Sequence, residues 1–136
     1  MEKLKVGVIG GTGMVGQRFV TLIANHPWFE LKVIAASARS AGKTYGEAAG
    51  RRWALDVPMP ECAKDIVIKD AADVEGVSGE VDFVFSAVDM KADEIRALEE
   101  EYAKSETPVV SNNSANRWTP DVPMVIPEIN PGHLEI

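Results

Sequence analysis

The sequence predicts an α/β fold of the Rossmann-like, doubly wound class, with a mostly parallel sheet. Short apolar runs rich in β-branched residues recur along the chain, and segments with helical spacing separate several of them. Runs that are apolar throughout are typical of strands buried on both faces, as in parallel sheets covered by helices on either side. A glycine-rich turn also follows the first run, as in nucleotide-binding folds of this class.

The first predicted strand covers residues 3–9 and stops at the glycines. The segment after them has apolar residues spaced i, i+4, i+7 and i+8: Val15, Phe19, Leu22 and Ile23. This spacing predicts a helix that ends before Pro27. Further apolar runs predict strands at residues 31–36, 66–68, 81–85 and 108–110. A stripe between the last two predicts a crossover helix: Ile95, Leu98 and Tyr102.

Other segments have weaker patterns. Residues 42–65 fit neither period and predict a short helix with a long loop, and residues 124–126, which lie between two prolines, predict a last strand. The final eight residues are typical of a linker or the start of another element. Three consecutive glutamates, Glu99, Glu100 and Glu101, are expected on the solvated side of the crossover helix.

Composition limits the classes of function. A chain of 136 residues that is 46% hydrophobic and 26% charged predicts one compact domain. Its net charge of −7 argues against a nucleic-acid surface or an anionic membrane, and no apolar stretch is long enough for a membrane span or signal peptide. The single Cys62 cannot form an internal disulfide, so we expect a cytoplasmic protein. His26 and His133 lack metal-like spacing, and no metal is predicted.

Small or hydroxyl residues follow four of the predicted strands: Gly10, Ser37, Ser86 and Ser111. The carboxyl ends of parallel strands meet at one edge of a sheet, where open α/β sheets bind their ligands. The pattern therefore favours a ligand across this edge. The alternative is that these residues only form turns.

The glycine-rich segment fits two motif frames, one starting at Gly10 and one at Gly11, and both end at Gly16. In either frame, glycines allow the backbone to approach a diphosphate, which amides at the helix N-terminus then bind. Thr12 adds a hydroxyl. Glycines also simply end strands, but here they lie between a predicted strand and a predicted helix. We therefore predict nucleotide binding.

The end of the second strand favours NADP(H). NAD-specific sites usually have a carboxylate there, whereas this chain has Ser37, Arg39 and Ser40. Glu30 precedes the strand and so lies at the wrong edge. A cation between two hydroxyls suits a 2′-phosphate. The alternative is a solvated arginine in a polar turn.

A second polar loop, residues 111–117, follows the fifth strand and ends in Arg117. From the residues alone, a ligand-binding loop and an ordinary turn with a surface charge are equally supported. Cys62 lies in a proline-bounded loop ahead of the third strand, and we do not expect it to be a nucleophile.

Four segments together resemble aspartate-semialdehyde dehydrogenase, closest to its archaeal and fungal branch: VGVIGGTGMVGQRF, AASARSAGK, FVFSAVD and VVSNNSANRWTPDVPMVIPEIN. The resemblance covers nearly the whole chain. It implies NADPH-dependent reduction of L-4-aspartyl phosphate to the semialdehyde with release of phosphate, on the route to lysine, methionine and threonine.

The resemblance also implies roles for particular residues. The diphosphate loop falls on Thr12, Gly13, Met14 and Val15, and the 2′-phosphate cluster on Ser37, Arg39 and Ser40. Ser86 and Ala87 match the turn that passes beneath the nicotinamide ribose, and Arg117 matches the arginine that binds the substrate's phosphate. Asn112 is also expected to bind the cofactor. The chain departs from the family at three positions: Gly11, Asn113 and Asn116.

The family's nucleophilic cysteine, histidine base and carboxylate-binding arginine have no counterparts in this chain. We therefore expect residues 1–136 to be an NADP(H)-binding domain that is inactive alone. A catalytic and dimerisation domain is expected after residue 136, and with it a small-molecule substrate and a homo-oligomer, dimer or tetramer. Two alternatives remain open, a malonyl-CoA reductase of the same superfamily and a non-catalytic NADP-sensing module. N-acetyl-glutamyl-phosphate reductase fits the last segment less well.

Overall fold

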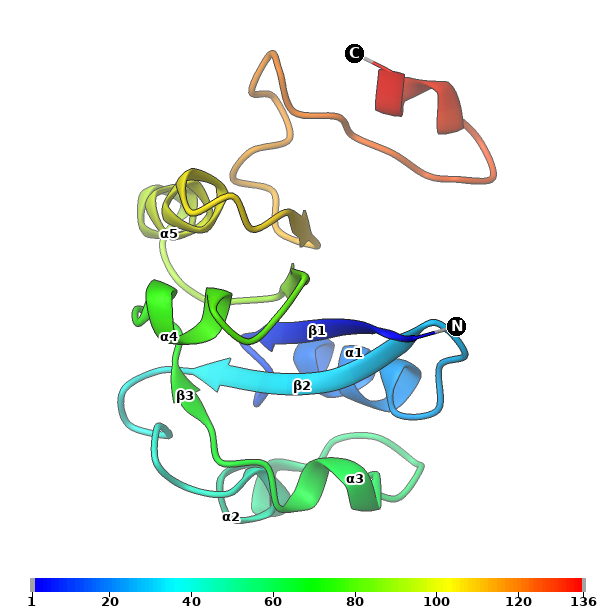
Figure 1. Cartoon of the computed structure of the whole chain (residues 1–136). Coiled ribbons are helices and arrows are strands. Elements are labelled where there is room, and N and C mark those ends of the chain that lie inside the picture. The colour runs from blue at the N-terminus through cyan, green and yellow to red at the C-terminus, as the bar shows by residue number, and fades with distance from the viewer. Residues whose placement is uncertain (1, 136) are drawn as a thin grey trace.

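Five parallel strands form one sheet in the computed structural model, which describes residues 2–135. The strands are β1 (Leu4–Ile9), β2 (Phe29–Ala36), β3 (Lys69–Asp70), β4 (Phe83–Ser86) and β5 (Val109–Ser111). Their order in the sheet is β3-β2-β1-β4-β5, so β1 lies at the centre (Figure 1). All four pairings are parallel.

Helices cover both faces of the sheet. They are α1 (Met14–Ile23), α2 (Tyr45–Ala49), the 3-10 turn η1 (Gly50–Arg52), α3 (Glu61–Lys64), α4 (Val74–Ser78), α5 (Ala92–Lys104) and the 3-10 helix η2 (Pro131–Glu135). One buried cluster joins the sheet to α1, α2 and α3, and the other joins it to α4 and α5. This arrangement confirms the predicted doubly wound class.

The two clusters follow from the alternation of side chains along each strand. In β1, Val8 belongs to the first cluster and Ile9 to the second, and in β2 Ile34 and Ala35 divide in the same way. Each of these side chains is fully buried. Burying a valine or isoleucine side chain stabilises a fold by roughly 1.5 to 3 kcal/mol, so the central strands contribute to two cores at once.

The buried face of α1 matches the prediction at Phe19 and Ile23 but not at Val15 and Leu22. Gly16, Gln17, Val20 and Ile23 are buried, while Leu22 is 62% exposed and Val15 is also exposed. The cause is Gly16, where an added Cβ would collide with the carbonyl oxygen of Gly10. This close approach rotates the helix so that Gly16 faces the sheet.

The third strand was predicted at residues 66–68, and this was wrong. Ile68 instead exchanges backbone hydrogen bonds with the preceding turn: its N–H donates to the Lys43 carbonyl at 2.8 Å, and its carbonyl accepts from Gly42 at 2.9 Å. Val67 makes an isolated antiparallel bridge with Thr44. Because residues 42–44 already bind the backbone groups of residues 67 and 68, parallel pairing with β2 begins only at Lys69.

The predicted last strand at residues 124–126 is also absent. The N–H of Ile126 donates to the Asn130 side chain at 2.7 Å, and that of Met124 approaches His133 Nδ1 at 3.0 Å. Local side chains thus bind the backbone N–H groups that a strand would use to pair with a neighbouring strand. The chain after β5 runs away from the sheet as an extended segment, coloured orange to red in Figure 1. Across residues 2–135, no helix has both the length and the apolar character that crossing a membrane requires.

Candidate functional site

The carboxyl ends of the strands form one edge of the sheet, as predicted. Backbone hydrogen bonds connect these ends: Gly10 donates to the Ala35 carbonyl at 2.8 Å, Ala87 to Ile9 at 2.9 Å, and Asn112 to Ser86 at 2.9 Å. β1 continues into α1 on one face, and β4 leads to α5 on the other. Such a switch point between neighbouring strands opens the crevice in which doubly wound folds bind ligands.

A cleft of about 880 Å³ lies at this edge. Its lining includes residues from the ends of four strands, β1 to β4, and the loops after them: Gly10, Thr12, Gly13, Ser37, Asp70, Ala87 and Asp89. Its outer walls come from α4 and α5, through Val74, Glu94 and Leu98 among others. The cleft is large enough for a small organic ligand.

The glycines of the turn meet different requirements. Gly10 has a φ of 81°, and an added Cβ there would collide with the Ala87 carbonyl oxygen. Gly10 and Gly16 are therefore needed for backbone packing. Gly13 is different, because the nearest atom to an added Cβ is the Gly10 carbonyl oxygen at 3.9 Å. The open space at Gly13 belongs to the cleft, where a ligand can approach the backbone.

The N-terminus of α1 faces the cleft without a capping side chain. Gly13 is the N-cap residue, and no side chain caps it or places a negative charge in the first turn. The first amide groups of a helix have no partner within the helix, and they carry a partial positive charge. Met14 and Val15, the other predicted contacts, are exposed here. The arrangement fits the predicted diphosphate site.

The three residues predicted to bind the 2′-phosphate differ in their access to the cleft. Ser37 lines the cleft directly after β2. Arg39 is exposed in the following turn and is outside the cleft lining, whereas Ser40 is buried and its N–H donates to the Ser37 carbonyl at 2.9 Å. Only Ser37 therefore has direct access to the cleft in this arrangement. No carboxylate takes the place that an NAD-specific site would give it at the end of β2.

The residues after β4 and β5 lie side by side. The buried Ser86 Oγ accepts a hydrogen bond from Asn113 Nδ2 at 3.0 Å. Ala87 lines the cleft, while Asn112 is exposed. The guanidinium of Arg117 donates to the Asn112 carbonyl at 3.1 Å and is otherwise exposed. The structure thus brings the predicted ribose contacts and the predicted phosphate-binding arginine onto adjacent loops.

Glu99 was expected on the solvated side of α5, and this was wrong. It is only 5% exposed. Its carboxylate accepts hydrogen bonds from Asn116 Nδ2 at 3.0 Å, from Asn113 Nδ2 at 3.3 Å, and from Ser111 Oγ. Asn113 and Asn116 are two of the three positions at which the chain departs from the family pattern. Their amide groups provide donors that a buried carboxylate requires.

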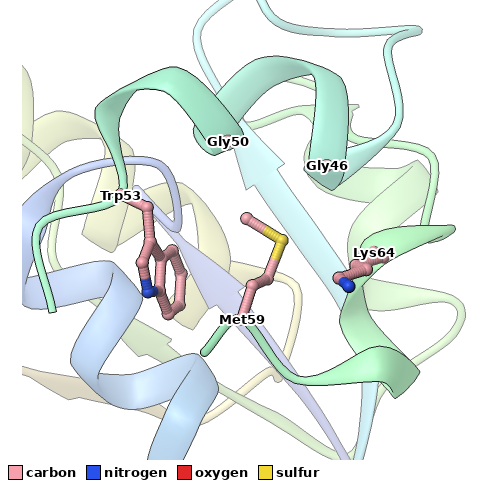
Figure 2. A pocket seen from close by; sticks show the side chains of 5 residues that line it. All are labelled: Gly46, Gly50, Trp53, Met59 and Lys64. Carbon is pink, nitrogen blue, oxygen red and sulfur yellow. The ribbon is translucent and has the colours of Figure 1, made fainter. Parts of the chain in front are cut away.

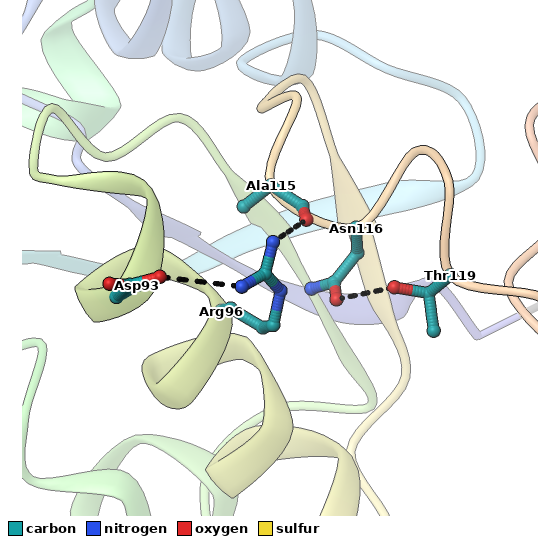
Figure 3. Close-up of polar contacts among 5 residues, drawn as sticks. All are labelled: Asp93, Arg96, Ala115, Asn116 and Thr119. Atoms are coloured by element: carbon teal, nitrogen blue, oxygen red, sulfur yellow. Dashed lines mark hydrogen bonds and ion pairs between the residues drawn. The ribbon is translucent and has the colours of Figure 1, made fainter.

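Arg96 holds the same loop from one turn earlier in α5. Its guanidinium donates to the Ala115 carbonyl at 2.9 Å and pairs with Asp93 at 3.4 Å (Figure 3). The Asn116 side chain in turn accepts from Thr119 Oγ1 at 3.1 Å. Residues 111–119 are therefore fixed against α5 by side chains rather than by regular secondary structure.

Comparison with known proteins identifies the family. A family model described as "Semialdehyde dehydrogenase, NAD binding domain" matches residues 5–136. The chain belongs to this family. An aspartate-semialdehyde dehydrogenase from Methanothermobacter thermautotrophicus is 50% identical over 133 residues, which are 98% of this chain and 36% of that protein. One from Saccharomyces cerevisiae is 45% identical over 130 residues, or 96% of this chain and 34% of that protein.

A solved structure with the same enzyme name is similar to this chain in both fold and sequence. The crystal structure of aspartate-semialdehyde dehydrogenase with NADP from Candida albicans has a TM-score of 0.90 and 42% identity to this chain. The match covers 98% of this chain and 36% of that one. The chain thus spans about a third of the length of the relatives that it matches.

Two residues that support the glycine turn of this semialdehyde dehydrogenase domain were missed by sequence reasoning. Gln17 is 1% exposed, and its amide group donates to the carbonyls of Thr12 and Arg52, both at 3.0 Å. Its Oε1 accepts from the N–H of Ala54 at 2.8 Å. The fully buried Tyr45 donates its hydroxyl to the Gly11 carbonyl at 2.7 Å, and burial raises the pKa of this hydroxyl. A polar residue directly after Gly16 was the available signal for Gln17.

Cys62 is exposed on α3 and is not among the residues that line the cleft. The ring of His26 stacks on Phe29 with centroids 4.3 Å apart, and His133 contacts Met124. Among residues 2–135, no group of three or more His, Cys, Asp or Glu side chains has a metal-binding arrangement.

Proposed function

We propose that this chain is the NADP(H)-binding part of an aspartate-semialdehyde dehydrogenase. Such an enzyme reduces L-4-aspartyl phosphate to L-aspartate 4-semialdehyde and releases phosphate. Its family and the names of its relatives support the proposal. The observation that carries it is the uncapped N-terminus of α1, which opens into the cleft at the switch point between β1 and β4.

The residues around the cleft fit such a cofactor. In the proposal, the amides from Thr12 to Val15 bind the diphosphate, and Gly13 leaves the space for its approach. Ser37, with Arg39 and Ser40 in the turn beside it, forms the 2′-phosphate site. Ser86, Ala87 and Asn112 lie along the ribose of the nicotinamide. When bound, the cofactor supplies the hydride that reduces the acyl group.

Arg117 is the proposed binding residue for the phosphate group of the substrate. Its planar guanidinium can donate two parallel hydrogen bonds to phosphate oxygens, which a lysine cannot do. The bond from Arg117 to the Asn112 carbonyl keeps the guanidinium close to the loop after β4. A thiol nucleophile and its base are expected elsewhere in the protein, because Cys62 is remote from the cleft. A homo-oligomer and a cytoplasmic location stay predictions.

Calorimetric titration tests the proposal. The protein should bind NADPH more tightly than NADH, because Ser37 at the end of β2 accepts a 2′-phosphate where a carboxylate would repel it. Arg39→Ala should reduce this preference by about 10- to 100-fold, the equivalent of one charge-assisted contact. Equal affinity for the two cofactors in the unmodified protein would refute NADP specificity, and binding of neither would refute the cofactor site.

A further inference from the structure

The charge of the cleft is unfavourable for the ligand proposed above. Six carboxylates line it: Asp70, Asp73, Glu75, Asp89, Glu94 and Glu101. Among the described residues that line it, Arg52 is the only cation. A cofactor with a diphosphate and a 2′-phosphate brings several negative charges into this region. Amide groups at the N-terminus of α1 offset part of that charge, but apart from Arg52 the described lining of the cleft offers phosphate no cationic side chain.

The backbone of Arg52 is held close to the glycine turn. Arg52 ends η1, and its carbonyl oxygen accepts a hydrogen bond from Gln17 Nε2 at 3.0 Å. The same nitrogen donates to the Thr12 carbonyl at 3.0 Å. A single buried amide group therefore joins the turn after β1 to the end of η1. This holds the backbone of Arg52 close to the turn that contains Thr12 and Gly13, and all three residues line the cleft.

The guanidinium of Arg52 is available for a ligand. The salt bridges within residues 2–135 use the cations of Lys64, Lys69, Arg96 and Lys104, and Arg52 is not among them. The neighbouring hollow of about 400 Å³ has Trp53 and Met59 in its lining and lies beside Gly50 of the same turn (Figure 2). Arg52 is exposed, and it lines the cleft but not this hollow.

We propose that Arg52 binds a phosphate group of the dinucleotide. This inference rests on the proposed cofactor function and adds to it a residue that the sequence motifs do not include. Arg39 follows Ser37 but lies outside the cleft lining, whereas Arg52 forms part of the wall itself. The phosphate is either the diphosphate beside Gly13 or the 2′-phosphate beside Ser37, and both would accept charge-assisted hydrogen bonds.

The test is a titration of Arg52→Ala and Arg51→Ala with NADPH and NADH. Arg51 lies in the same 3-10 turn, is exposed and does not line the cleft, so its substitution is matched in charge and position. Arg52→Ala keeps the backbone carbonyl that Gln17 binds, so thermal unfolding should be nearly unchanged. NADPH affinity should fall by about 10- to 100-fold in Arg52→Ala and by less than about twofold in Arg51→Ala.

The two cofactors distinguish the two phosphates. A loss confined to NADPH assigns Arg52 to the 2′-phosphate, and an equal loss for NADPH and NADH assigns it to the diphosphate. The inference is overturned if both arginine variants bind NADPH like the unmodified protein. Failure of the unmodified protein to bind NADPH would instead overturn the cofactor site as a whole, so the two failures are distinguishable.

Discussion

Four glycines in and just after one turn have different structural roles. Gly10 and Gly16 allow two backbones to meet, and a side chain at either position would collide with a carbonyl oxygen. Gly11 packs against a side chain instead, since an added Cβ would lie 2.5 Å from Ile34 Cγ2. Only Gly13 borders open space. All of these glycines belong to the sequence motif. Their spacing alone does not show which of them are needed for backbone packing and which leaves room for a ligand.

Gly13→Ala should weaken NADPH binding while leaving the fold almost intact. The added methyl group enters the space proposed for the diphosphate, and its cost as an N-cap residue is under about 1 kcal/mol. Thermal unfolding and titration on the same sample measure the two effects.

The matched variant is Gly11→Ala, which adds the same methyl group at a position that faces the core rather than the cleft. Crowding against Ile34 should cost about 1 to 3 kcal/mol of folding free energy, and less in an Ile34→Ala background. A Gly13→Ala protein that binds NADPH normally would show that the diphosphate does not approach the backbone at this residue.

At the level of elements, the sequence predicted those with long or regular patterns. β1, β2, β4, β5, α1 and α5 form close to the predicted residues, because apolar runs and helical stripes report directly on burial. α4 was missed because its five residues are too few to show a period. Its N-cap is Asp73, whose side chain accepts a hydrogen bond from the N–H of Gly76. β3 was misplaced because the turn at residues 42–44 competes for the same backbone groups.

The candidate site was predicted less completely than the fold. The strand ends were correctly expected at one edge, since parallel topology requires it. The burial of Glu99 could not be read from three consecutive glutamates, because it depends on where the loop after β5 packs. Arg52 belongs to a segment without a regular period, and its backbone is tied to the glycine turn by a hydrogen bond from Gln17. Side-chain networks between distant segments leave no periodic signal in a sequence.

Glu99→Ala should loosen the loop after β5. The substitution removes the acceptor for Ser111, Asn113 and Asn116, and about 1 to 3 kcal/mol of stability should be lost with it. Hydrogen exchange of the amides in residues 111–117 should become faster. Glu100→Ala changes an exposed neighbour on the same helix and should leave exchange unaltered. Similar exchange in both variants would contradict a clamp by Glu99.

For the whole molecule, two buried tyrosines connect outer elements to the sheet. Tyr45 bonds to the Gly11 carbonyl from one face, and Tyr102 bonds to the Ala71 carbonyl at 2.7 Å from the other. Burial raises the pKa of both hydroxyls, and for Tyr102 the charges of Asp73 and Asp70 raise it further. Each core therefore contains a tyrosine hydroxyl that must stay protonated to donate its hydrogen bond.

The free energy of unfolding should decrease above about pH 10, the usual pKa of an unfolded tyrosine. In the folded state these hydroxyls keep their protons to higher pH, so their contribution is fully present below that pKa and is lost as pH rises through the raised values. Urea unfolding at pH 8 to 11 measures the slope. Tyr45→Phe should flatten it, although it costs about 1 to 3 kcal/mol at every pH by leaving the Gly11 carbonyl unpaired. An unchanged slope in Tyr45→Phe would show that this hydroxyl does not control alkaline stability.

The central position of β1 also sets the order in which the molecule can assemble. One edge of β1 is closed by β4, and Lys5 meets Asp82 across 77 residues of chain. A ribosome adding about 5 to 20 residues per second needs roughly 4 to 15 seconds to make that stretch. During this interval the N-terminal strand has an unpaired edge, which is the kind of surface that pairs with other chains. Within this sheet, the strand that is synthesised first is thus one of the last to gain both neighbours, and we expect chaperones to retain nascent chains that stop before residue 83.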